Sequence, residues 1–133
     1  MFMQEKRKKE RREFNQALLL RDVPEITSNI SLGNNINADI GARVFDVLLS
    51  LNTSEAESAI QVVLNNPGWN PNYHAADSWH PEERAMIHHR EDLAIQIISH
   101  PNFDKKEYPR VIRSADFFKA DKVLDFLVGR IRQ

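Results

Sequence analysis

Cysteine is absent from the 133-residue chain, and glycine occurs only four times. The chain therefore has no disulfide, thiolate zinc site, iron–sulfur cluster or thiol nucleophile, and this composition fits a reducing compartment. The longest uninterrupted apolar run covers only residues 17–20, whereas a membrane-spanning helix needs roughly 18 apolar residues. The first ten residues are charged and lack the apolar segment of a Sec signal peptide. We therefore expect a cytoplasmic protein, with delivery into a host cell by a non-Sec route as the alternative.

Neither sign of charge predominates, because the formal net charge of the chain is only −1. The exception is residues 1–14, which have a net charge of +3, while the rest of the chain has −4. The basic residues of this segment are Lys6, Arg7, Lys8, Lys9, Arg11 and Arg12. They are candidates for contact with phosphates of nucleic acid or anionic lipid. The interleaved glutamates reduce their field, so a solvated helix face is the favoured interpretation, and nucleic-acid or membrane binding is a secondary hypothesis.

Helical periodicity dominates the sequence. Apolar residues recur at intervals of three and four, and Ser54 with Glu57 has the spacing of a capping box. Pro81 and Pro109 stand where helices begin, because proline is tolerated in the first helical turn. We predict helices over residues 4–20, 38–51, 54–65, 81–89, 91–99, 109–115 and 120–131, with residues 22–35 irregular. The expected organisation is a basic N-terminal helix and linker over residues 1–36, followed by one helical domain over 37–133.

An internal similarity supports helices stacked in pairs. Residues 63–70 match residues 97–104 at a constant offset of 34: an apolar pair, two polar residues, proline, any residue, an aromatic residue, then Asn or Asp. A period of 20–50 residues with two helices in each unit is typical of stacked helical repeats. Trp69 and Phe103 occupy equivalent positions, and we expect both to pack between the repeat units.

These residues resemble the ankyrin repeats in a degenerate form. Residues 84–104 are similar to the family's inner helix, tight turn, outer helix and extended segment, and Tyr108 with Pro109 stands where the family has Thr-Pro. The resemblance covers roughly residues 54–128, although the Thr-Pro-Leu-His motif itself is absent. It implies an all-α fold of stacked antiparallel helix pairs that binds another protein, without cofactor or catalysis. Sparse glycine makes the repeats similar to those of secreted bacterial effectors.

The predicted partner-binding surface combines the 66–80 linker with the inner helices. Large aromatic side chains on a polar linker are typical binding anchors. The candidate contact residues are Tyr73, Trp79, Arg84, His88, His89, Arg110 and Arg113.

A histidine-rich segment raises the alternative of a metal-dependent or other small hydrolase. All five histidines lie within residues 74–100, at His74, His80, His88, His89 and His100. The chain has no HExxH motif, and the adjacent His88 and His89 diverge on a helix. It also offers no GxSxG motif, no glycine-rich phosphate loop and no acid pair in an apolar setting that would perturb a pKa. We therefore predict neither a metal site nor catalytic residues.

Overall fold

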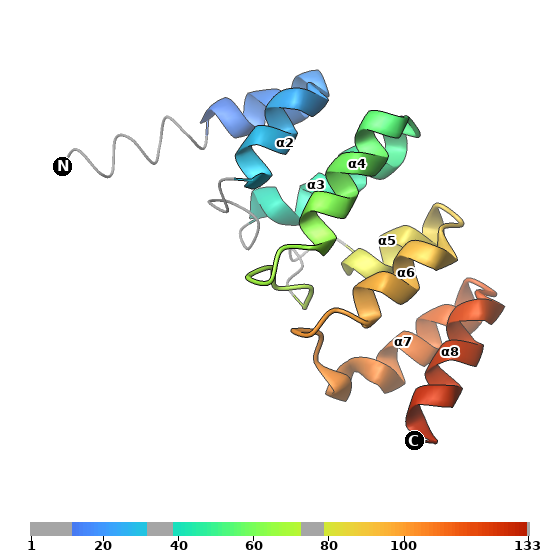
Figure 1. Ribbon diagram of the computed structural model, residues 1–133. Helices are drawn as coiled ribbons and strands as arrows, with labels where there is room; N and C mark the ends of the chain where they lie inside the picture. Colours follow the sequence, from blue (N-terminus) through green and yellow to red (C-terminus); the bar gives the residue numbers. More distant parts are fainter. Residues whose placement is uncertain (1–11, 32–38, 73–78, 133) are drawn as a thin grey trace. The chain divides into compact units, whose positions relative to one another are not determined.

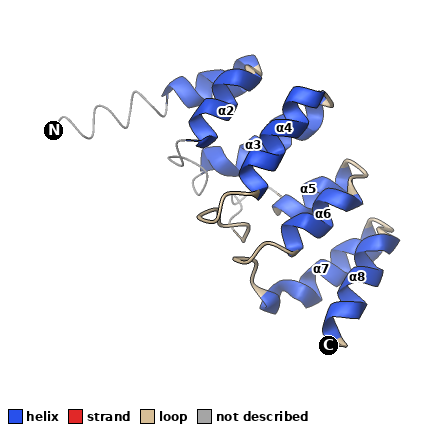
Figure 2. Cartoon of the chain, in the orientation of Figure 1, coloured by secondary structure: helices blue, strands red, loops and turns tan. Residues whose placement is uncertain are grey.

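The computed structural model describes residues 12–31, 39–72 and 79–132, and this part of the chain is helical without any strand (Figures 1 and 2). A first helix covers residues 12–20. The later elements are α2 (Val23–Ser31), α3 (Asp39–Leu51), α4 (Ser54–Leu64), α5 (Pro81–Ile87), α6 (Glu91–Ile98), the 3-10 turn η1 (Lys105–Glu107), α7 (Tyr108–Phe117) and α8 (Asp121–Ile131). The all-α prediction is confirmed for these residues. None of the described helices is both long and apolar enough to cross a membrane.

Helix α2 corrects the prediction that residues 22–35 are irregular. The Asp22 carboxylate accepts a hydrogen bond from the Glu25 amide at 3.3 Å, as a helix-capping side chain does. Pro24 lies in the first turn of the helix, where no amide donor is required. Ile26 and Ile30, one turn apart, are completely buried. The i, i+4 pair of isoleucines therefore outweighs the turn-forming composition of this segment.

Helix α4 begins with a different cap from the one we expected. The Thr53 hydroxyl accepts from the Ala56 amide at 3.1 Å, and Ser54 is already the first helical residue. The predicted Ser54–Glu57 capping box is therefore wrong by one position. Thr53 and Ser54 both have hydroxyl side chains. Thr53 is the cap because its backbone is extended, as a residue that precedes a helix requires.

Two compact units divide the chain, residues 1–69 and residues 70–133. In the N-terminal unit, α2 and α3 both pack against α4. Trp69 is only 2% exposed and stacks on Phe45 of α3 with 5.2 Å between the ring centroids, so the residue is buried as a packing role requires, against the helix pair that it follows. The domain boundary predicted near residue 36 lies outside the described residues.

The C-terminal unit contains two helix pairs. Helix α5 packs against its pair partner α6 and against α7, and α8 packs against its pair partner α7 and against α6. Phe103 is buried and stacks on Tyr108 at 6.2 Å, which confirms its predicted packing role. The core of this unit is made of Ala85, Leu93, Ile97, Val111, Ala115, Val123 and Leu127.

The segments that follow α4 and α6 form the same local hydrogen bonds at the offset of 34. The Trp69 amide donates to the Asn66 carbonyl, and the Phe103 amide donates to the His100 carbonyl. One residue earlier, the Gly68 amide donates to the Asn66 side chain and the Asn102 amide to the His100 ring. The sequence similarity of these segments therefore corresponds to a shared local geometry.

Left-handed residues connect the helices of each pair. Arg21, Asn52, His89 and Lys119 all have φ between 51° and 60°. At the turns of Arg21, His89 and Lys119, the backbone amide of the left-handed residue donates to the carbonyl three positions earlier. The amide of the next residue donates to the carbonyl five positions before its own position. This is the hydrogen bonding of a Schellman helix terminus, where glycine is the usual residue.

Replacing Lys119 by glycine should therefore stabilise the protein. A side chain at positive φ costs roughly 1 kcal/mol, and glycine removes that strain, so we expect Lys119→Gly to raise the free energy of unfolding by up to about 1 kcal/mol. Asp125→Gly, at an exposed position inside α8, is the control and should lower it by roughly 0.3 kcal/mol, the difference in helix propensity between aspartate and glycine. Chemical denaturation of the three proteins measures both effects. Equal destabilisation by the two substitutions would contradict the assignment of strain to residue 119.

Candidate functional site

A buried charged cluster lies at the start of α5. Pro81 occupies the first turn and places Glu82 and Glu83 directly after it, where carboxylates face the positive end of the helix dipole. Glu82 is completely buried and Glu83 is 6% exposed. Carboxylates at this depth require a buried cation or donors.

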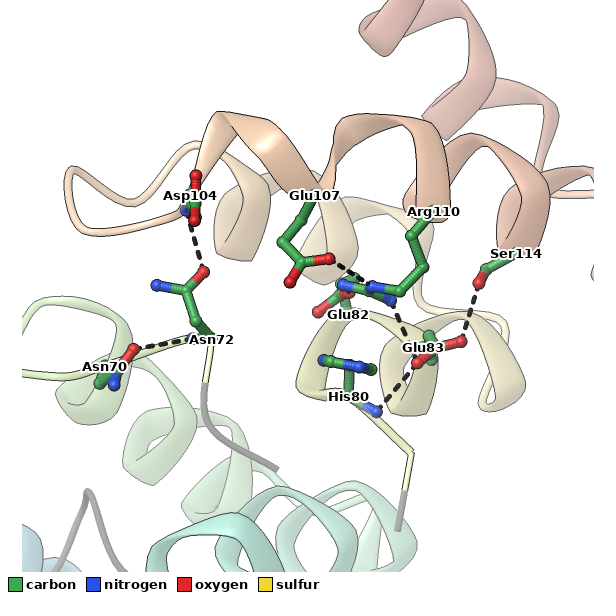
Figure 3. A network of polar contacts seen from close by, with 9 residues as sticks. All are labelled: Asn70, Asn72, His80, Glu82, Glu83, Asp104, Glu107, Arg110 and Ser114. Atoms are coloured by element: carbon green, nitrogen blue, oxygen red, sulfur yellow. Dashed lines mark hydrogen bonds and ion pairs between the residues drawn. The ribbon is translucent and has the colours of Figure 1, made fainter. Parts of the chain in front are cut away.

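Arg110 of α7 supplies that cation (Figure 3). Its Nη2 lies 2.5 Å from Oε1 of Glu82, its Nη1 lies 3.3 Å from Oε1 of Glu83, and its Nε donates to Oε2 of Glu107 at 2.8 Å. One guanidinium therefore joins the first turn of α5 to the first turn of α7. We call Glu82, Glu83, Glu107 and Arg110 the ionic cluster.

Glu83 makes two further contacts. Its Oε1 accepts from the backbone amide of His80 at 3.0 Å, and its Oε2 accepts from the Ser114 hydroxyl at 2.8 Å. Figure 3 shows this carboxylate between the chain that enters α5 and the middle of α7. Both oxygens of Glu83 thus have hydrogen-bond donors from separate elements.

Burial changes the protonation of the ionic cluster. It raises the pKa of Glu82 from 4.5 to about 7, outweighing the attraction of Arg110 that acts in the opposite direction. The pKa of Arg110 is raised above its usual value, because Glu82 and Glu107 together outweigh the opposing effect of its own burial. Glu82 therefore corrects our expectation that the chain has no acid whose apolar surroundings perturb its pKa. The cation that pairs with Glu82 lies 28 residues away in sequence, so no local motif indicates the pair.

His80, Glu82 and Glu83 offer potential metal-ligand atoms that all lie within 4.8 Å of one another. The guanidinium of Arg110 already lies against both carboxylates, and a metal ion would have to bind beside this fixed positive charge. The other described histidines have separate local positions. His88 ends α5, His89 is the left-handed turn residue, and buried His100 accepts from the Asn102 amide.

Three aromatic side chains form a second, exposed feature of the C-terminal unit. The ring of Trp79 meets that of Phe118 edge to face at 5.7 Å, and Phe117 meets Phe118 at 5.1 Å. Trp79 is 47% exposed and Phe117 is 75% exposed. We call Trp79, Phe117 and Phe118 the aromatic cluster. Sequence reasoning identified Trp79 but missed the two phenylalanines, whose only signal was an apolar pair at the end of a polar helix.

The predicted contact residues divide between these two features and the surface. Trp79 belongs to the aromatic cluster, while Arg113 and His89 are exposed. Arg84 and His88 are half-buried. Arg110 differs from the prediction, because its charge is held by carboxylates of the chain itself and not offered on an open helix face. Tyr73 lies outside the described residues.

Only one member of the basic N-terminal segment can be placed. Arg12 is exposed in the first described helix, and Lys6, Arg7, Lys8, Lys9 and Arg11 lie outside the described residues. Phe14, two positions after Arg12, is completely buried in the N-terminal unit. Any truncation that tests the basic residues should therefore stop before Phe14.

Comparisons with protein-family models, with curated proteins and with solved structures find no match to this chain. The chemistry of the two clusters is therefore the basis on which a function is proposed.

Proposed function

We propose that this chain is a non-catalytic module that binds another protein through the aromatic cluster and the adjoining surface of α7. The observation that carries the proposal is the exposure of Trp79 and Phe117, at 47% and 75%. Tryptophan and other large aromatic side chains dominate the binding energy of protein interfaces, because each removes a large rigid apolar area from water.

The charge beside the cluster defines the partner's chemistry. Arg113 is exposed and lies one helical turn before Phe117, so both side chains share one face of α7. Within the described part of the chain Arg113 forms no ion pair. This face therefore fits a partner segment that presents an apolar side chain and a carboxylate about one turn apart.

The proposed scaffold is an ankyrin-like stack of helix pairs. Its support is the contact of α5 with α7 and of α6 with α8, together with the left-handed turn residue between the helices of each pair. Such a stack can bind a partner without a deep polar pocket, because adjacent helix pairs together form an extended surface. A role as a bacterial effector or adaptor acting in the cytoplasm is compatible with this kind of module.

The proposal predicts that Trp79→Ala and Phe117→Ala each weaken partner binding about tenfold or more, as loss of an interface anchor does. The chain is immobilised, a nuclease-treated cell lysate is passed over it, and the captured protein is purified for affinity measurement. Leu19→Ala, at an equally exposed leucine of the N-terminal unit, is the matched control and should bind normally.

Salt separates this proposal from its rival. Binding through the aromatic cluster should persist between about 0.15 and 0.5 M salt, whereas contact through the basic N-terminal segment should collapse. Capture that is unaffected by both aromatic substitutions, but lost when residues 1–11 are removed, would contradict the proposed surface and favour nucleic-acid or anionic-membrane binding.

A further inference from the structure

We propose that Glu83 is the positioning residue of the aromatic cluster, because its buried carboxylate ties the backbone next to Trp79 to the turn of α7 that precedes Phe118. The significance for partner binding rests on the proposed function, but the geometry can be tested without any partner.

The Glu83 carboxylate accepts one hydrogen bond next to Trp79 in the sequence and another one helical turn before Phe118. On one side, Glu83 accepts from the amide of His80, the residue that follows Trp79. On the other side it accepts from Ser114, which lies one helical turn before Phe118 and whose carbonyl accepts from the Phe118 amide at 2.9 Å. The edge-to-face contact of Trp79 with Phe118 therefore lies directly beyond the two anchors of this carboxylate.

Burial strengthens the two hydrogen bonds of Glu83. Glu83 is 6% exposed and Arg110 compensates its charge, so its hydrogen bonds compete little with water. A buried ion pair commonly stabilises a fold no better than apolar side chains of similar volume, and in some proteins its contribution is to select one arrangement over others. Here the selected arrangement is the one that brings Trp79, half of whose surface remains exposed, against Phe118.

The weaker alternative is that ring contact alone positions Trp79. An edge-to-face pair contributes only about 0.5–1.5 kcal/mol beyond the area that the rings bury. Under that alternative, removal of the Ser114 hydroxyl would leave the position of Trp79 unchanged. The two explanations therefore differ in a measurable way.

The test uses the full chain and nuclear magnetic resonance. The two tryptophan indole signals are assigned with Trp79→Phe, and nuclear Overhauser contacts between the rings of Trp79 and Phe118 are recorded. We expect Ser114→Ala and Glu83→Ala to abolish these contacts and to shift the Trp79 indole signal. Glu83→Gln, whose amide can accept from His80 and donate to Ser114, should restore them.

Asp92→Ala is the matched control, because it removes an exposed carboxylate that pairs with Arg90 in the same unit. It should leave the Trp79 signal unchanged. If Glu83→Ala fails to fold, Ser114→Ala alone decides, since it deletes one hydroxyl and no charge. Retention of the Trp79–Phe118 contacts in folded Ser114→Ala would overturn the positioning role, whether or not the aromatic cluster binds a partner.

Discussion

Unfolding of the protein is expected to become easier as the pH rises from about 4.5 to about 7, through the contribution of Glu82. Burial raises the pKa of this carboxyl to about 7 in the folded protein, while in the unfolded chain it returns to about 4.5. Between these values the folded state holds a proton that the unfolded state has released, so stability falls as the pH rises. The contribution is complete below the unfolded pKa and is lost once the pH exceeds the folded one.

The size of this effect is on the order of 3 kcal/mol, since each pKa unit corresponds to about 1.4 kcal/mol. The measurement is the free energy of unfolding from denaturant titrations at several pH values for the natural chain and Glu82→Gln. Glutamine keeps an oxygen for Arg110 and does not titrate, so the difference between the two proteins isolates Glu82. We expect the free energy of unfolding of the natural chain, relative to that of Glu82→Gln, to fall steadily between pH 4.5 and about 7.

Asp92→Asn is a control whose pH effect has the opposite sign and falls below the pH window of Glu82. The hydrogen bond from Arg90 lowers the pKa of Asp92, so its contribution is present above the usual aspartate value and lost as the pH falls below it. A natural chain and a Glu82→Gln variant with parallel pH profiles between 4.5 and 7 would show that Glu82 is not buried as described.

Among substitutions of charged residues in the C-terminal unit, Arg110→Ala should lower the free energy of unfolding the most. Removing the guanidinium leaves Glu82 and Glu83 buried without their cation, and breaking a buried pair on one side typically costs 3–5 kcal/mol, so we expect a loss of about that size. The same change should raise the pKa of Glu82 further, because the attraction that opposes burial disappears. Denaturant unfolding at pH 8, where Glu82 would otherwise be ionised, measures the loss.

Arg90→Ala is the matched control for this prediction. Arg90 pairs with Asp92 at 3.0 Å, but the Asp92 side chain is 62% exposed, so the loss should stay below about 1 kcal/mol. Combining Arg110→Ala with Glu82→Gln should recover part of the stability, because it removes one of the two uncompensated charges. Equal effects of Arg90→Ala and Arg110→Ala would contradict the buried nature of the ionic cluster.

Local pattern was sufficient for most helices and for the packing of individual aromatic residues. Proline in the first turn placed the start of α5, and the offset of 34 assigned Trp69 and Phe103 to the core. Helix α2 was missed because Pro24 and the neighbouring polar residues are equally typical of a turn, and only the burial of Ile26 and Ile30 distinguishes the two. Composition alone does not say which side chains find a neighbouring helix.

The sequence by itself determined the helical class, most helix boundaries and the exclusion of cysteine chemistry, because periodicity and capping act over a few residues. Tertiary structure alone decided the two clusters. Glu82 and Glu83 resemble ordinary helix-start carboxylates until α7 brings Arg110 and Ser114 against them from about 30 residues away. Phe118 likewise gains its partner Trp79 only when the chain before α5 reaches the end of α7. Burial and charge pairing depend on neighbours that are distant in sequence, so no local rule specifies them.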